Sequence, residues 1–184
     1  FLLVLGLFLW GMGVYNSMVK LDEGINSAWS QVENQYQRRL DLIPNLVGAV
    51  KGIVGHEQEV FLGIAKAREA YFQSKDKPVA EKAQAATSYE SALSRLLVLQ
   101  ERYPELRANE SFLKLQDEIS GAENRIGVER GRYNDSVKEL NTFARSLLGS
   151  LYTSLAKVEK AEYFEIGEAA KTAPKVDFSP SKDG

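Results

Sequence analysis

The residues best suited to chemistry are concentrated in residues 35–57. This stretch holds the arginine pair Arg38 and Arg39, together with Asp41, Pro44 and the single histidine, His56. Arginine and aspartate side chains in one cluster could bind a ligand, or they could join helices through buried ion pairs. His56 and Glu59 could share a helix face, but they would supply fewer ligands than a zinc site needs. We therefore expect a surface histidine and no metal site.

Composition removes several classes of function. The 184-residue chain has no cysteine, which excludes disulfides, thiolate metal sites and cysteine nucleophiles. A single histidine makes multi-histidine zinc sites and serine triads unfavourable. Lys and Arg number 23 against 25 Asp and Glu, so no overall positive field favours nucleic acid. We expect no enzymatic activity, no cofactor and no nucleic-acid partner.

Residues 1–19, which precede the polar stretch, are predicted to form a membrane anchor. Its sequence, FLLVLGLFLWGMGVYNSMV, has no charged, hydroxyl or amide side chain before Tyr15. A few apolar residues ahead of Phe1 would complete the roughly 20 that span a bilayer. A cleaved signal peptide is the alternative, but Gly11-Met12-Gly13 is a poor cleavage site. Trp10 and Tyr15 suit the membrane interface.

The charges that follow the anchor bear on its orientation. Lys20 is followed by Asp22 and Glu23, and the next cations are Arg38 and Arg39. This is not the dense Lys/Arg cluster typical of a cytoplasmic side. We expect the soluble part to lie outside the cytoplasm.

A helical stripe of apolar residues then predicts one long helix from the membrane to about Phe72. The stripe recurs at steps of three and four at Met18, Leu21, Ile25, Ala28, Val32, Tyr36, Ile43, Leu46, Val50, Ile53, Val60, Ile64, Ala67 and Tyr71. Pro44 lacks the N–H that would bond the carbonyl of Leu40 and normally costs about 3 kcal/mol in a helix interior. Because the stripe keeps its phase, a kink at Pro44 is favoured over a loop, although Asp41 could instead cap a new helix.

Three further helices complete the predicted bundle. A break at SKDKP (74–78), with Asp76 or Lys77 as the cap, precedes a helix over residues 79–103. Residues 104–111 form a connector in which Asn109 caps the third helix, and that helix runs over residues 112–144. Its apolar stripe comprises Phe112, Leu115, Ile119, Ala122, Ile126, Tyr133, Val137, Leu140 and Ala144. A fourth helix follows over residues 145–162. The fold class is all-α: an N-terminal transmembrane helix continuing into an antiparallel up-and-down bundle of about four long helices. The bundle covers residues 20–166, and residues 167–184 form a flexible tail.

Several motifs resemble those of the LemA family, in order and over nearly the whole chain. The first block comprises YNSMV (15–19), AWSQVE (28–33), QRRLDLIPNLV (37–47), Val50-Lys51 and His56-Glu57. The second comprises YPELRANESF (103–112), LQDE (115–118), ENRI (123–126) and RYN (132–134), and YFE (163–165) resembles the closing motif. Family members usually have a Phe-Pro step where this chain reads Thr142-Phe143-Ala144-Arg145.

The resemblance implies a bacterial single-pass inner-membrane protein with a bundle of long helices and no established enzymatic activity. Some members lie beside membrane-embedded heat-shock metalloproteases and others serve in membrane organelles. A membrane-associated scaffold or adaptor is what the family likeness suggests. We expect the bundle, anchored in the lipid bilayer, to use one helix face to form homo-oligomers or to bind a membrane protease or another membrane protein.

Two interpretations of the polar residues remain. A buried network between Arg38, Arg39 and Asp41 and the third-helix residues Glu123, Asn124 and Arg125 would set the helix register. Asn134 and Asn141, seven residues apart on the third helix, would then be interhelical hydrogen-bonding groups. Alternatively, a sensor or ligand-binding module would use a polar site around Arg38, Asp41, Glu123 and Arg125.

Overall fold

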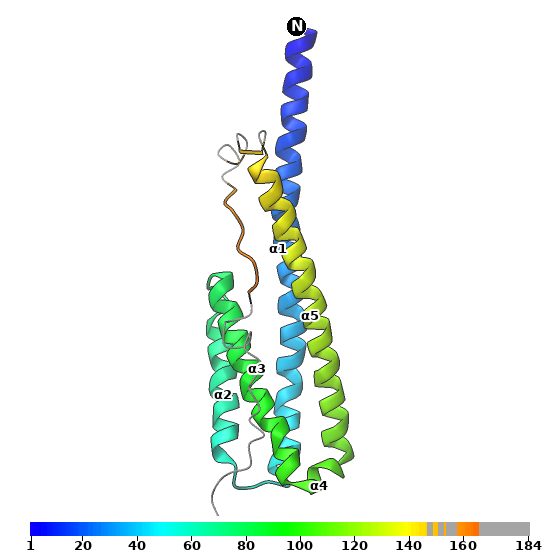
Figure 1. The fold of residues 1–184 in the computed structure, drawn as a ribbon, viewed down its shortest axis with the longest axis vertical. Helices are drawn as coiled ribbons and strands as arrows, with labels where there is room; N and C mark the ends of the chain where they lie inside the picture. Colours follow the sequence, from blue (N-terminus) through cyan, green and yellow to red (C-terminus); the bar gives the residue numbers. More distant parts are fainter. Residues whose placement is uncertain (147–148, 151–152, 154–157, 166–184) are drawn as a thin grey trace, which may run out of the picture.

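The fold is built from helices alone in the part of the chain that the structure describes. The computed structural model describes residues 1–146, 149–150, 153 and 158–165. Its helices are α1 (Leu2–Lys51), α2 (Gln58–Gln73), α3 (Val79–Arg102), α4 (Pro104–Arg107) and α5 (Glu110–Arg145) (Figure 1). No described residue lies in a strand, which confirms the predicted all-α class.

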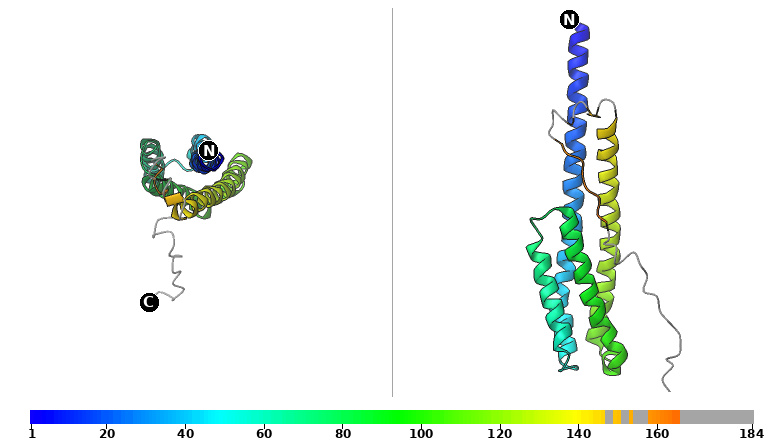
Figure 2. Two further views of the ribbon diagram at one scale, coloured as in Figure 1. Left: turned by 90° about the horizontal axis from the view of Figure 1, so that it is seen from above. Right: turned by 60° about the vertical axis from the view of Figure 1, so that its left-hand side comes forward.

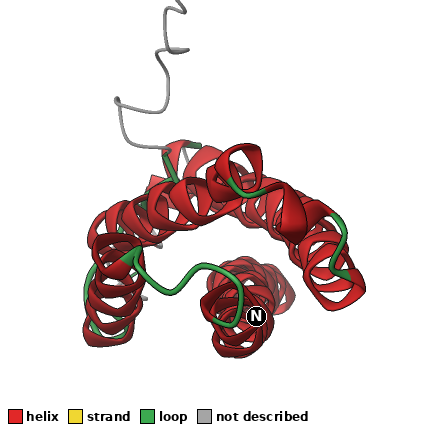
Figure 3. Cartoon of the chain, turned by 90° about the horizontal axis from the view of Figure 1, so that it is seen from below, coloured by secondary structure: helices red, strands yellow, loops and turns green. Residues whose placement is uncertain are grey.

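Four long helices form an antiparallel up-and-down bundle, as predicted. α1 runs the length of the molecule, α2 returns beside it, α3 reverses again and α5 leads back towards the N-terminal end (Figure 1). α4 is a single turn between α3 and α5. Seen along the long axis, α2, α3 and α5 form an arc, and α1 lies in its hollow (Figures 2 and 3).

The apolar stripe of α1 faces this arc, because residues three and four apart lie on one face of a helix. Its buried members are Met18, Ile25, Val32, Tyr36, Leu40, Ile43, Leu46 and Val50. Facing them, α3 buries Ala83, Ala86, Tyr89, Leu93, Leu96 and Leu99. The stripe predicted for the third helix is confirmed, with Phe112, Ile119, Ala122, Ile126, Tyr133, Val137 and Leu140 all buried in α5.

The apolar start of α1 projects beyond the bundle (Figure 1). Met18 is the first buried core residue among the side chains of α1 that the structure describes. The apolar residues Phe1, Leu2, Leu3, Val4, Phe8 and Leu9 are all more than half exposed. An 18-residue window of α1 has a mean hydropathy of 1.7, and 6% of that window is buried. By length and composition, α1 can cross a membrane.

The prediction of one helix from the membrane to Phe72 is wrong. α1 ends at Lys51, and the chain reverses in residues 52–57 before α2 begins at Gln58. Gly52 and Gly55 lie in this turn, and each costs a helix about 1 kcal/mol relative to alanine. The stripe kept its phase across the turn because α1 and α2 bury their apolar faces in the same core.

α1 continues as one helix through Pro44, and Asp41 begins no new helix. Figure 1 shows no abrupt bend along α1, so the kink predicted at Pro44 is not a sharp one. Pro44 is exposed, so its ring displaces no core side chain.

The next boundaries agree closely with the sequence. α3 spans 79–102, with Pro78 itself at the cap position where Asp76 or Lys77 was expected. The connector 104–111 contains α4, and the Asn109 side chain accepts a hydrogen bond from the Phe112 N–H at 2.9 Å, as the predicted cap of α5.

The fourth predicted helix, 145–162, is wrong over its last part. α5 ends at Arg145, and residues 158–165 form no helix but run back beside α5 (Figure 1). Residues 147–148, 151–152 and 154–157 lie outside the described part, as does the predicted tail, 167–184.

Candidate functional site

A cluster of charged side chains joins three of the long helices. Glu90 of α3 lies between Arg39 of α1 and Arg130 of α5. The guanidinium Nη2 of Arg130 donates to Glu90 Oε1, and Arg39 Nη1 lies 3.7 Å from the same oxygen. The hydroxyl of Tyr36 donates a third contact at 3.1 Å. The Glu90 carboxylate is therefore shared between α1 and α5.

Arg39 extends the cluster to a second carboxylate. Its Nη2 lies 3.4 Å from Oε2 of Glu123 on α5, and its side chain is 3% exposed whereas that of Glu123 is 60% exposed. Arg130 also lies over two aromatic rings, 5.3 Å from the centroid of Tyr36 and 4.6 Å from that of Phe164. Two cations and two anions thus balance in one connected group.

Burial and pairing act in opposite directions on these groups. Burial raises the pKa of the Glu90 carboxyl to about 7; Arg39 opposes the shift, and the Glu123 carboxylate adds to it. Burial lowers the pKa of Arg130 to about 10, which keeps its guanidinium charged at neutral pH. Glu90 therefore gains or loses its proton near neutral pH.

The structure brings together only part of the predicted network. Arg39 and Glu123 meet, but Arg38, Asp41, Asn124 and Arg125 are exposed. Asp41 accepts a hydrogen bond from Gln37 on its own helix at 2.8 Å, not from α5. The arginine pair divides because adjacent helical residues point about 100° apart, so that only Arg39 faces the arc.

Sequence reasoning missed Glu90 and Arg130, although their spacing carried a signal. Glu90 stands four residues after Ala86 and three before Leu93, which are both buried. Arg130 stands in the same relation to Ile126 and Tyr133. A charged residue in an apolar slot of each stripe indicates a buried partner.

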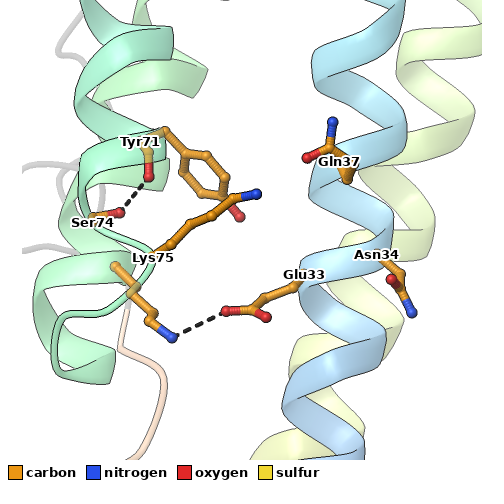
Figure 4. A pocket seen from close by; sticks show the side chains of 7 residues that line it. Glu33, Asn34, Gln37, Tyr71, Ser74 and Lys75 are labelled. Atoms are coloured by element: carbon orange, nitrogen blue, oxygen red, sulfur yellow. Dashed lines mark hydrogen bonds and ion pairs between the residues drawn. The ribbon is translucent and has the colours of Figure 1, made fainter.

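A small pocket lies between α1 on one side and the end of α2, the following turn and the start of α3 on the other (Figure 4). Its volume is about 190 Å³, and it is lined by Glu33, Asn34, Gln37, Tyr71, Ser74, Lys75 and Lys82. Glu33 already accepts from Lys82 Nζ at 3.0 Å and from Trp29 Nε1 at 2.6 Å. The pocket is smaller than a typical small-molecule site, and its central ion pair is satisfied internally.

The predicted asparagines bind a different element from the one expected. The amide groups of Asn134 and Asn141 pair with the backbone of residues 158–165, not with another helix. The prediction of interhelical bonds is wrong because this segment, expected as a helix, is extended and exposes its N–H and C=O groups.

His56 is exposed in the turn between α1 and α2, as predicted for a surface histidine. Within the described ranges, no group of three or more His, Asp or Glu side chains is placed to hold a metal ion. The charged cluster of Arg39, Glu90, Glu123 and Arg130 joins three helices, and it can fix the register of those helices.

Comparison with models of protein families shows where the chain belongs. The model of the LemA family matches residues 28–178 of the chain. No curated protein matches it.

The adjacent arginines give a first test. Arg39→Ala should lower the free energy of unfolding by about 3–5 kcal/mol, because it leaves Glu90 and Glu123 short of a cation. Arg38→Ala, one residue away on the exposed side, should change it by less than about 0.5 kcal/mol. Urea unfolding in detergent, followed by circular dichroism, measures both. Equal effects of the two substitutions would contradict the assignment.

The pKa of Glu90 predicts a pH dependence. The folded carboxyl holds its proton up to about pH 7 and the unfolded one only to about 4.5. The unfolding free energy of the native chain should therefore fall relative to Glu90→Gln as pH rises from 4.5 to 7, by up to about 3 kcal/mol. Urea titrations of both proteins at pH 5 and pH 8 measure this. If the native chain instead became more stable relative to Glu90→Gln as the pH rises, the attraction of Arg39 and Arg130 would outweigh the effect of burial.

Proposed function

The chain belongs to the LemA family, and we propose that it is a membrane-anchored, non-enzymatic scaffold or adaptor of the bacterial inner membrane. The observation that carries the proposal is the continuity of α1. One helix of 50 residues contains both the exposed apolar projection and the central strut of the bundle. At about 1.5 Å per residue, it extends roughly 75 Å.

This continuity supports a rigid stalk. A hinge would need a break in the helix, and α1 has none between Leu2 and Lys51. Trp10 and Tyr15, both partly exposed, occupy positions where aromatic side chains favour the membrane interface. The bundle would then stand at a fixed distance from the bilayer, with α5 ending near the membrane and α4 at the far end.

The side of α1 that faces away from the arc is the proposed contact surface. Its exposed residues recur at helical spacing: Asn34, Arg38, Asp41, Asn45 and Gly48. In the described part of the chain, the arc of α2, α3 and α5 leaves this side of α1 open (Figure 3). A mixed-charge stripe on a helix suits a second copy or a helix of another membrane protein, such as a membrane protease.

A non-enzymatic role fits the way in which the polar groups are used. Arg39, Glu90 and Arg130 bind one another, and Glu33 binds Lys82. The alternative sensor site around Arg38, Asp41, Glu123 and Arg125 has less support, because Arg38 and Asp41 are exposed and Asp41 pairs with its own helix. We place the bundle on the extracytoplasmic side, since Asp22 and Glu23 follow Lys20.

The proposed membrane anchor can be tested by placing charged residues in the apolar start of α1. Leu5→Arg with Leu9→Arg should move the chain from the membrane fraction to the soluble fraction, because each arginine costs roughly 2.5–3.5 kcal/mol inside a bilayer. Leu62→Arg with Val98→Arg, at exposed apolar positions on the bundle, is the matched control and should leave the distribution unchanged. Fractionation with carbonate extraction measures it. Retention of the Leu5/Leu9 variant in the membrane would overturn the anchor.

Assembly can be tested by mass. Light scattering of the detergent-extracted chain, corrected for detergent, should give a mass well above 20.5 kDa. Arg38→Glu with Asp41→Arg should lower this mass, because it reverses the charges of the proposed contact surface. Both side chains are exposed, so the fold should be retained. Lys66→Glu, on the exposed side of α2, should not. A monomeric native chain that captures no membrane protein would contradict the scaffold.

A further inference from the structure

The described C-terminal segment, residues 158–165, is bound as an extended peptide. Its sequence is VEKAEYFE, and it runs antiparallel to α5 after the chain has turned back (Figures 1 and 2). It belongs to no helix.

Two asparagines of α5 hold the backbone of this segment. Asn141 donates from Nδ2 to the Ala161 carbonyl at 2.9 Å and accepts the Ala161 N–H on Oδ1 at 3.1 Å. Asn134 donates from Nδ2 to the Phe164 carbonyl at 3.1 Å and accepts the Phe164 N–H on Oδ1 at 2.8 Å. Each side-chain amide therefore satisfies both backbone groups of one residue, as a neighbouring strand would.

The spacing of the two asparagines matches an extended chain. Seven residues along a helix rise about 10.5 Å, and three residues of extended chain cover about 10 Å. Asn134 and Asn141 are therefore in register with Phe164 and Ala161. Glu162 lies between Ala161 and Phe164 in the segment, and its carbonyl accepts a hydrogen bond from the hydroxyl of Tyr133 at 2.8 Å. α5 thus presents a ready-made row of partners for an extended backbone.

Phe164 is the one side chain of the segment that is deeply buried. It is 5% exposed, stacks on Trp29 with ring centroids 6.1 Å apart, and lies under the guanidinium of Arg130. Trp29 in turn meets Tyr133 edge to face at 5.2 Å. The adjacent Tyr163 is 41% exposed. We call the surface formed by Trp29, Arg130, Tyr133, Asn134 and Asn141 the groove. Its contacts fit an extended backbone with an aromatic residue at one position.

We propose that this groove also receives residues 158–165 of a second copy of the chain, so that neighbouring copies exchange these segments in the membrane. This inference rests on the self-assembly proposed above. The same contacts form whether the segment comes from its own chain or from a neighbour, so exchange replaces each contact with an identical one. A shared membrane orients the copies alike and raises their local concentration. Twelve residues of the sequence lie between α5 and the segment, and a stretch of that number of residues can reach at most roughly 40 Å.

The groove is tested with a labelled peptide, VEKAEYFE with both ends blocked, added to the full chain in nanodiscs. Phe164→Ala weakens the chain's own segment, so this variant should bind the peptide at least tenfold more tightly than the native chain, by fluorescence anisotropy. Adding Asn134→Ala or Asn141→Ala should abolish that gain. Tyr163→Ala, the matched control, should bind as the native chain does. A gain that survives loss of both asparagines would overturn the groove.

The donor of the segment is tested by cross-linking, since the chain has no cysteine of its own. Chains carrying Lys138→Cys are co-expressed with chains carrying Glu162→Cys, and membranes are treated with a bismaleimide of about 10 Å reach. The proposal predicts covalent dimers that disappear when Asn134→Ala and Asn141→Ala are added. A third variant carries both cysteines in one chain. If that variant cross-links only within single chains and the two single-cysteine chains form no covalent dimer, exchange is overturned. If light scattering still shows an oligomer in that case, the proposed self-assembly stands and only this inference fails.

Discussion

The Glu90 side chain is only 23% exposed, so its ionised carboxylate needs cations beside it, and this requirement fixes how α1, α3 and α5 stand against one another. Apolar stripes tolerate slippage, because one aliphatic side chain can take another's place when a helix shifts by a turn. A shared carboxylate does not tolerate it, because a shift of one turn, about 5.4 Å, would separate Glu90 from the guanidinium of Arg39 or Arg130. The ion cluster therefore selects one register among several that the apolar core alone would permit.

Periodicity and capping residues were enough to predict most of the helices. The stripes on α1 and α5 and the cap at Asn109 follow from local rules, and the structure has them where the sequence placed them. The ion cluster was predicted only in part, since Arg39 and Glu123 were named and Glu90 and Arg130 were not. A charged residue on a helix usually faces solvent, and the partner that makes burial favourable lies on another helix. That pairing is a long-range property, visible in the sequence only as charges in otherwise apolar slots.

The two failures of the helix prediction have different causes. Residues 52–57 reverse the chain, but a helical stripe reports only which face is buried, and a turn that returns the chain to the same core leaves the stripe in phase. Residues 158–165 have a composition that suits a helix. They are extended because Asn134, Asn141 and Tyr133 supply partners for their backbone groups, and Phe164 finds an aromatic pocket. Local propensity gives way there to side chains far away in the sequence.

Arg130 connects the ion cluster to the bound segment. Its guanidinium binds Glu90 on one side and covers the ring of Phe164 on another. If the groove were vacated, Arg130 would gain water, the burial that raises the pKa of Glu90 would weaken, and Trp29 would lose its stacking partner. An empty groove would therefore weaken the contacts that fix the helix register of the bundle. A groove filled by a neighbour's segment would keep those contacts. This difference favours direct replacement of one segment by another over release into solvent, and the membrane anchor supplies the neighbour.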